Sequence, residues 1–147
     1  MYVRDGSDAI NLYQTSLTWE LGEVVAGTLN ATKDSHRNTP QAIDVTVQSI
    51  ESAGTEDVVA TSSTVADAKN HLNDLVTFSF NNITTSSSSS STYYYATSGN
   101  DKVQLYNKFG IENMDFSSLE DGKEYKVTGI IIAYNSTIEI CPTEAIT

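Results

Sequence analysis

Short runs of β-prone residues dominate the chain, several of them with the period of two that is typical of β-strands. Short β-rich runs in the first half carry Val3, Ile10, Leu12, Val24, Val25, Leu29, Ile43, Val45 and Val47, and those of the second half span residues 75–80, 93–97, 103–106, 125–134 and 137–141. Polar segments at residues 5–8, 98–101 and 134–137 predict tight hairpin turns between neighbouring runs. The pattern therefore predicts an all-β protein.

One segment departs from this period. Residues 64–67 read Thr-Val-Ala-Asp, which fits a capping box, and Val65, Ala68, Leu72 and Leu75 follow with helical spacing. We therefore expect one short helix near residues 64–72. Its apolar face is expected to plug one end of a β-barrel, and a partner-binding face is the alternative.

Six serines at residues 86–91 interrupt the strands of the second half. A segment of this composition has no apolar surface to bury, which is typical of a flexible loop. Because strand signals precede and follow it, we expect it to tip a long hairpin.

An internal repeat organises the chain. Residues 2–13 align without gaps on residues 95–106, with Val3, Ile10 and Leu12 falling on Ala96, Val103 and Leu105. Residues 22–27 likewise resemble residues 122–129, and the glycines at 27 and 129 predict bulges or bends within long strands. Each half then consists of a strand, turn, strand, loop, glycine-containing strand, turn and final strand.

Five coiled strands of this kind form an OB-fold barrel. The prediction is an all-β chain with one short helix and a duplicated five-stranded OB-fold-like barrel, of which the first copy is incomplete. An incomplete unit spans residues 1–58, a linker with the helix 59–74 and a complete unit 75–147. The opening strand at residues 75–84 has no counterpart before Met1. A single β-sandwich drawing strands from both halves is the competing fold.

A missing opening strand leaves one edge of the first unit open, and open edges favour association. Three elements could cover this edge: the β-prone residues 58–65, a partner molecule, or an upstream segment. We favour residues 58–65, which predicts a mainly monomeric chain.

Composition narrows the function. The 147 residues carry a net charge of −11, with eight scattered Lys and Arg side chains and 36 serines and threonines. Binding to phosphates needs clustered basic residues, so nucleic acid and anionic membranes are disfavoured as partners. No apolar run approaches the roughly 20 residues of a membrane span. The single cysteine, Cys141, excludes an internal disulfide and is expected to be structural.

No residue pattern indicates a reaction. The carboxylates near residues 20–23 and 120–124 lie in solvated turns, which do not separate two pKa values as acid–base catalysis requires. Asp5 and Asp8 are too few oxygen ligands for calcium. His36 and His71 have no neighbouring nucleophile. The sequence therefore predicts no catalytic residue, no metal site, no cofactor and no enzyme.

Several segments carry a resemblance to a known group of proteins, namely YVRDGSDAINLY, LGEVVAGTL, LVTFSFNNIT, DKVQLYNKF and DGKEYKVTGIIIAYNSTIEICPTEAI. They resemble the tandem OB-fold-like domains of secreted or surface-exposed Bacteroidetes proteins, most of unknown function. The resemblance covers most of the chain and is best over residues 75–147. It implies an OB-like barrel, duplication and an extracytoplasmic location, here as part of a longer chain.

The candidate ligand surface is a set of tyrosines. The repeat register turns Tyr94 inward and Tyr93 and Tyr95 outward, together with Gln104 and Tyr106. OB-folds bind ligands on this face, and exposed tyrosines stack on sugar rings or bases. Cross-strand tyrosine pairs that stiffen the sheet are the alternative. The equivalent surface of the first copy carries Tyr2, Arg4, Asn11 and Tyr13.

Two functions of different kinds follow. The first is a non-catalytic binding or accessory module of a secreted bacterial protein, with a glycan as the expected ligand. The second is a structural spacer without a ligand. Single-stranded nucleic acid is a further alternative, and it ranks below a glycan because the negative charge repels a polyanion.

Overall fold

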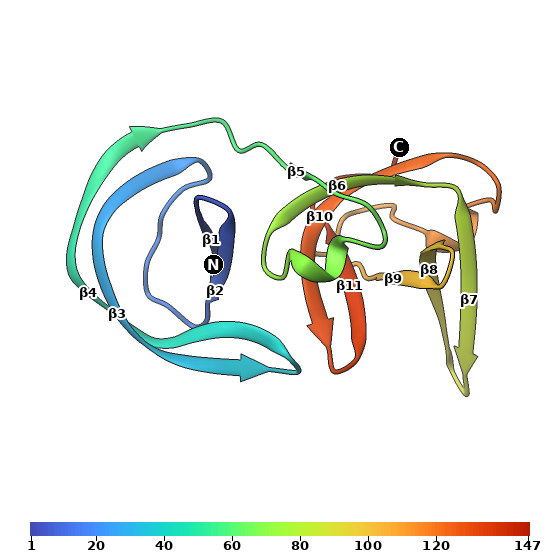
Figure 1. Ribbon diagram of the computed structural model, residues 1–147, viewed down its shortest axis with the longest axis horizontal. Coiled ribbons are helices and arrows are strands. Elements are labelled where there is room, and N and C mark those ends of the chain that lie inside the picture. The colour runs from blue at the N-terminus through green and yellow to red at the C-terminus, as the bar shows by residue number, and fades with distance from the viewer.

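β-Strands form almost all of the regular structure in the computed structural model, which describes residues 1–147. They build two open mixed sheets, one of four strands and one of seven. There is no α-helix, and neither sheet closes into a hydrogen-bonded barrel. The all-β prediction is therefore confirmed. Figure 1 shows the two sheets side by side, with the chain passing from one to the other through β5.

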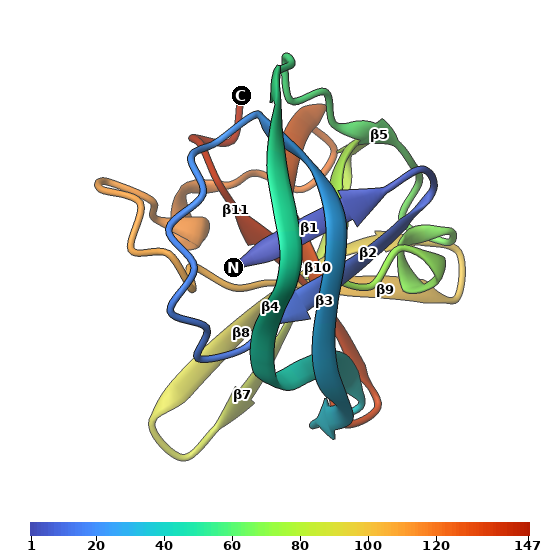
Figure 2. The same cartoon turned by 90° about the vertical axis from the view of Figure 1, so that its left-hand side faces the viewer.

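The first sheet lies within residues 1–58 and has the strand order β1-β2-β4-β3. Its strands are β1 (Tyr2–Asp5), β2 (Asp8–Leu12), β3 (Glu23–His36) and β4 (Thr39–Thr55). β1 and β2 form a hairpin, and the long β3–β4 hairpin curves around them (Figures 1 and 2). β1 and β2 pair with each other and with β4 rather than with residues 75–84 or 103–106, as the single sandwich would require.

The second sheet has the strand order β5-β6-β10-β11-β9-β8-β7. Its strands are β5 (Thr61–Ser62), β6 (Leu75–Phe80), β7 (Asn82–Ser88), β8 (Ser91–Ser98), β9 (Asp101–Leu105), β10 (Tyr125–Tyr134) and β11 (Thr137–Pro142). β6 pairs with β10 and β7 pairs with β8, yet only Asn81 separates β6 from β7 along the chain. One bent segment thus borders both β10 and β8.

The two sheets share the same strand pairing at equivalent positions. In each sheet a tight hairpin is followed by a parallel pair and then by a long antiparallel hairpin. The matching pairs are Val3↔Ile10 with Ala96↔Val103, Asn11↔Gln41 with Gln104↔Glu139, and His36↔Thr39 with Tyr134↔Thr137. β1, β2, β3 and β4 therefore correspond to β8, β9, β10 and β11, and the predicted turns at residues 5–8, 98–101 and 134–137 are confirmed.

The core belongs almost entirely to the second sheet. Its main cluster holds 12 buried residues, among them Val76, Val103, Val127, Ile131 and Ile140. Within residues 1–58 only Leu12, Gln41 and Ala42 are buried. The repeat predicted three inward-facing residues in each copy. The second copy buries all three of them, Ala96, Val103 and Leu105, whereas the first copy buries only Leu12.

The prediction of a helix over residues 64–72 is wrong. The Thr64 hydroxyl accepts a hydrogen bond from the Asp67 backbone N–H at 3.1 Å, as a cap should, but only the 3₁₀ helix η1 (Ala68–Asn70) follows. The segment then bends at Asn73, whose φ is +68°, and Leu72 forms a β-bridge to Ile131. Pairing with the sheet ends the helix here. The buried side of the segment was predicted correctly, since Val65 and Ala68 are 5% and 0% exposed.

The expectation that residues 58–65 cover the open edge of the first unit is also wrong. β5 lies in this segment and pairs in parallel with β6 of the second sheet, Thr61 opposite Val76 and Ser62 opposite Thr77. The hydroxyl of Thr61 further donates to Asp74 at 2.8 Å. β6 would otherwise be the edge strand of a well-packed sheet, so the short strand β5 pairs with β6 instead of with the first sheet.

The serine run tips a hairpin as predicted, but most of it is strand. β7 and β8 pair as far as Ser88 and Ser91, which leaves only residues 89–90 at the tip. The serine composition predicted a longer loop than the structure has. Strand pairing extends into the serines because backbone hydrogen bonds need no apolar side chain.

The two strand glycines were predicted to mark bulges or bends. A Cβ on Gly129 would stand 2.4 Å from the Cys141 carbonyl oxygen, and one on Gly27 would stand 1.9 Å from that of Ser49. β3 has register shifts around Gly27, whereas Gly129 is paired regularly on both sides. Gly27 itself pairs regularly with Ile50 between two of these shifts, so neither glycine lies at a bulge, and both allow two backbones to approach closely.

Candidate functional site

The predicted tyrosine surface lies on β8 and β9. Tyr95 stands opposite Gln104 of β9 on one side and Thr84 of β7 on the other, and Tyr93 stands opposite Ser86. Paired residues of antiparallel strands share a face, so these side chains form one outer surface. Tyr93 is 39% exposed and Tyr106, just beyond β9, is 45% exposed. The structure thus brings together four of the seven predicted ligand residues.

Tyr94 points the other way, as the period of two predicts. It packs against the core cluster, and its ring lies 6.3 Å from that of Phe116 in the 3₁₀ helix η2 (Phe116–Ser118). The packing of Tyr94 against the core fixes the strand so that its two neighbours face outward. The serine hairpin lies beside the tyrosines in the sheet, because Ser86 pairs with Tyr93 rather than covering it.

Lys102 belongs to this surface, although the sequence argument did not include it. Its ammonium nitrogen lies 4.6 Å from the centre of the Tyr95 ring. Lys102 and Gln104 are two residues apart on β9, so the same alternation that selected Gln104 also selects Lys102. The cation makes the surface polar on one side and holds the Tyr95 ring in place.

The surface ends at a buried carboxylate. Gln104 stands beside Glu139 of β11, which is 6% exposed. Burial raises the pKa of Glu139 above its usual value, and the opposing influence of Lys108 is smaller. The equivalent residue of the first sheet is Gln41, which donates to Asp34 at 2.6 Å.

Arg4 lies at the joint between the two sheets rather than on the ligand surface. Its guanidinium donates to the Asp74 carboxylate at 2.6 Å and to the carbonyl oxygens of Val59 and Leu75, both at 2.9 Å. Asp74 is 3% exposed, so Arg4 neutralises a buried charge. These partners occupy the guanidinium in the folded chain.

Tyr2 also belongs to this joint. It packs against the small cluster of Ile130, Ile132 and Cys141, and its ring meets Phe109 edge-on at 6.4 Å. Tyr13 follows β2 and is 44% exposed. The structure therefore splits the predicted set: the residues of the second copy form a surface, and Tyr2 and Arg4 of the first copy serve contacts between sheets.

Hydrogen bonds across the joint continue along its length. The hydroxyl of Thr39 donates to the Ala133 carbonyl oxygen at 2.7 Å and accepts from the Ala133 N–H at 2.8 Å. The amide of Asn73 donates to the Pro40 carbonyl oxygen at 2.8 Å. Such short paired contacts favour a fixed arrangement of the two sheets.

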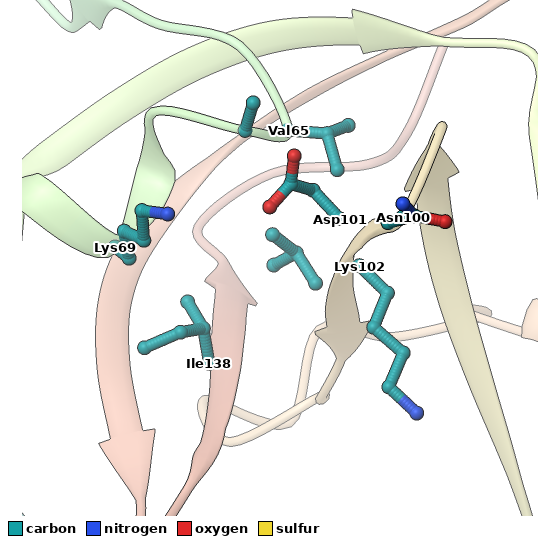
Figure 3. A pocket seen from close by; sticks show the side chains of 8 residues that line it. Val65, Lys69, Asn100, Asp101, Lys102 and Ile138 are labelled. Atoms are coloured by element: carbon teal, nitrogen blue, oxygen red, sulfur yellow. The ribbon is translucent and has the colours of Figure 1, made fainter.

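A cavity of about 200 Å³ lies between the segment of residues 65–69 and the β8–β9 turn. Figure 3 shows Val65, Lys69, Asp101 and Ile138 around it, with the Lys102 side chain directed away. None of the sequence-predicted residues lines this cavity. The tyrosine surface therefore lies outside this cavity.

Few groups on the molecule have the environment of a reactive residue. Burial raises the pKa of the Cys141 thiol to about 12, which keeps it protonated and unreactive at neutral pH. His71 pairs with Asp67 at 2.8 Å, and hydrogen bonds from Asn70 and His71 lower the pKa of that carboxyl. No group of three His, Cys, Asp or Glu side chains is arranged to hold a metal ion.

Comparisons with known proteins identify no relative. No protein-family model, curated protein or solved structure matches the chain. The structure also contains no helix with the length and apolar character needed to cross a membrane.

Proposed function

We propose that the chain is a non-catalytic binding module of a secreted or surface-exposed bacterial protein, with a glycan bound on the outer face of β8 and β9. The tyrosine patch, defined as Tyr93, Tyr95, Gln104 and Tyr106, is its ligand surface. The observation that carries the proposal is the exposure of Tyr93 and Tyr106 on a face fixed from below by the packing of Tyr94.

We further propose that both sheets are OB-like units. The order β7-β8-β9-β11-β10-β6, with β6 and β7 joined through Asn81, supports a partly open barrel of five strands in the second unit. The matching registers support duplication, with β1–β4 as a copy that lacks the first of those strands. In OB-folds the face of the second and third strands, here β8 and β9, binds ligands.

The chemistry of the patch favours sugars. Aromatic rings stack on the apolar faces of sugar rings, while the Gln104 amide and the hydroxyls of Thr84 and Ser86 beside the tyrosines offer hydrogen bonds. An open patch suits a chain-like ligand that lies along the strands. The net charge of −11 repels polyanions, which ranks a glycan above single-stranded nucleic acid.

A chemical-shift titration with a set of neutral oligosaccharides tests the proposal. We expect shifts confined to β8, β9 and the adjoining part of β7. Tyr93→Ala and Tyr106→Ala should each weaken binding about tenfold, since one stacked ring contributes ~1–3 kcal/mol. Tyr134→Ala, which removes an equally exposed tyrosine at the far end of β10, serves as the matched control.

Two results would replace this function. Silence toward every oligosaccharide would favour the structural spacer, for which the tight joint between the sheets is already suited. Shifts caused only by single-stranded DNA, and lost steeply as salt is raised, would favour the nucleic-acid alternative.

A further inference from the structure

Glu139 belongs to the same outer face of the second sheet as the tyrosine patch. It stands opposite Gln104 across the parallel β11–β9 pair, and Gln104 stands opposite Tyr95 across the β9–β8 pair. Paired residues of neighbouring strands point to the same side of a sheet, so the three side chains form one row over β11, β9 and β8 (Figure 1). Ile138 and Ile140, on either side of Glu139, pack in the main core and thereby fix the outward direction of the carboxylate.

The Glu139 side chain is almost enclosed and yet unpaired. The residue is 6% exposed. The ion pairs of the structure involve Asp67, Asp74 and Glu120, and none of its side-chain hydrogen bonds involves the Glu139 carboxylate. Asn73 Oδ1 is the only fully enclosed side-chain polar atom without a partner, so the Glu139 oxygens still reach the surface. A carboxylate that is this buried and has no donors costs free energy.

The first unit satisfies the equivalent position from within. Gln41 corresponds to Glu139 and is also 6% exposed, and its amide donates to the Asp34 carboxylate at 2.6 Å. One unit therefore gives its buried polar residue an internal partner, whereas the other leaves an acceptor open beside exposed tyrosines. Buried polar groups in folded proteins are almost always hydrogen-bonded, so an open one points to a partner from outside the chain.

Lys108 is the charged group that acts on Glu139. Its attraction lowers the pKa of Glu139 less than burial raises it, and the two side chains form no ion pair. The Lys108 side chain is exposed. Both carboxylate oxygens of Glu139 are thus left to accept hydrogen bonds from a ligand.

The chemistry of the row defines what such a ligand must offer. A carboxylate accepts hydrogen bonds and donates none, so the ligand must bring donors. Two hydroxyls on adjacent carbons of a sugar ring match its two oxygens, and bonds to an ionised acceptor are short and strong. Neighbouring strands lie about 4.8 Å apart, so a ring seated over Gln104 of β9 lies beside both Glu139 and Tyr95. A sugar that carries its own carboxylate is repelled from the same place.

We propose that Glu139 is a specificity-determining residue of the glycan site, where it accepts hydrogen bonds from two adjacent hydroxyls of a neutral sugar and rejects acidic sugars. This inference rests on the proposed function, and it extends the ligand surface from β8 and β9 onto β11. The tyrosines bind the faces of any sugar ring, whereas Glu139 selects among rings by their edge groups. The ligand supplies the donors that the folded chain withholds from this carboxylate.

Calorimetric titration of the full chain with neutral and acidic sugars tests the proposal. The neutral probes are cellohexaose, xylohexaose and mannohexaose, and the acidic probe is hexagalacturonate. We expect the native chain to bind at least one neutral probe, and to bind it at least about tenfold more tightly than the acidic one. Glu139→Gln keeps the shape of the side chain and should weaken neutral binding about tenfold, because a charge-assisted hydrogen bond is replaced by a neutral one. Its preference for neutral over acidic sugar should shrink by at least about tenfold.

Two matched variants separate this role from simpler ones. Glu144→Gln removes one charge at an exposed carboxyl and should leave both affinities unchanged, which excludes an effect of net charge alone. Tyr106→Ala should weaken neutral and acidic sugars by the same factor, since a stacked ring does not distinguish them.

The outcomes distinguish this inference from the function on which it rests. If Tyr106→Ala weakens binding and Glu139→Gln binds both kinds of sugar as the native chain does, the glycan site stands and the role of Glu139 is overturned. Equal affinity of the native chain for neutral probes and hexagalacturonate would overturn it as well. If no probe binds the native chain, the glycan site and the role of Glu139 fail together.

Discussion

The two units of this chain contain the same hairpin with the same register and bury it to different degrees. Val103 and Ala96 are 1% and 0% exposed, while the equivalent Ile10 and Val3 remain half-buried. The larger apolar side chains lie in the less buried copy. The size of the local side chains therefore does not determine how deeply the hairpin is buried. Burial depends instead on residues 75–84, which pair with both β10 and β8 and so cover the hairpin of the second unit.

The comparison also separates two uses of one surface. The outer face of β8 and β9 stays open and presents tyrosines, while on the outer face of β1 Tyr2 and Arg4 are engaged with the second unit. The first unit therefore owes part of its order to its neighbour. Substitutions in the core, in the joint and at the buried carboxylate test this account, in decreasing order of expected effect.

Ile140→Ala gives the second unit the residue that the first unit has at the equivalent position, Ala42. Ile140 is 0% exposed, so we expect the free energy of unfolding to fall by about 2–5 kcal/mol, measured by urea denaturation. Val47→Ala, at a side chain of the first unit that is 51% exposed, should change it by less than about 0.5 kcal/mol. Equal effects of the two substitutions would contradict the assignment of the core to the second unit.

Arg4→Ala removes the guanidinium that joins the units and leaves the buried Asp74 carboxylate without its cation. Thr61 and the Leu75 N–H still donate to that carboxylate, so we expect a loss of about 1–3 kcal/mol. The first unit should then unfold before the second, giving two transitions by circular dichroism and tyrosine fluorescence.

Arg37→Ala is the control for the joint. Its guanidinium lies 4.9 Å from the centre of the exposed Tyr134 ring, and such contacts contribute about 0.5–1 kcal/mol. If Arg4→Ala has no larger effect than Arg37→Ala, Arg4 is not the main connection between the units.

Glu139→Gln gives the second unit the amide that Gln41 supplies in the first. Because burial raises the pKa of Glu139, the folded state binds its proton more tightly than the unfolded state. This contribution to stability is present below the ordinary carboxyl pKa and is lost as the pH rises through the raised value. We therefore expect a small gain in stability for the variant at pH 7.

The difference between Glu139→Gln and the native chain should shrink as the pH falls below the usual range for glutamate. Parallel urea denaturation at several pH values measures it. Glu144→Gln, at an exposed carboxyl, should show no such trend. A difference that stays constant with pH would mean that the pKa of Glu139 is the same in the folded and unfolded states.

The sequence predicted the strands, the three tight turns and the outward direction of Tyr93 and Tyr95, because these follow from local alternation and turn chemistry. It predicted the wrong structure for residues 58–72. There the pairing of β5 with β6 and the bridge from Leu72 to Ile131 override the helical spacing of the apolar residues. It also assigned Arg4 to a ligand surface, since its partner Asp74 lies 70 residues away. Contacts of that kind depend on how the two units pack, which no local pattern contains.

Native-state hydrogen exchange of the chain alone tests the central claim most directly, namely that the absence of a covering strand leaves the first unit less stable than the second. We predict that amides of residues 2–30 exchange at least about tenfold faster than those of residues 125–141, at every protein concentration. Equal protection of the two regions, or protection of residues 2–30 that grows with concentration, would contradict the claim.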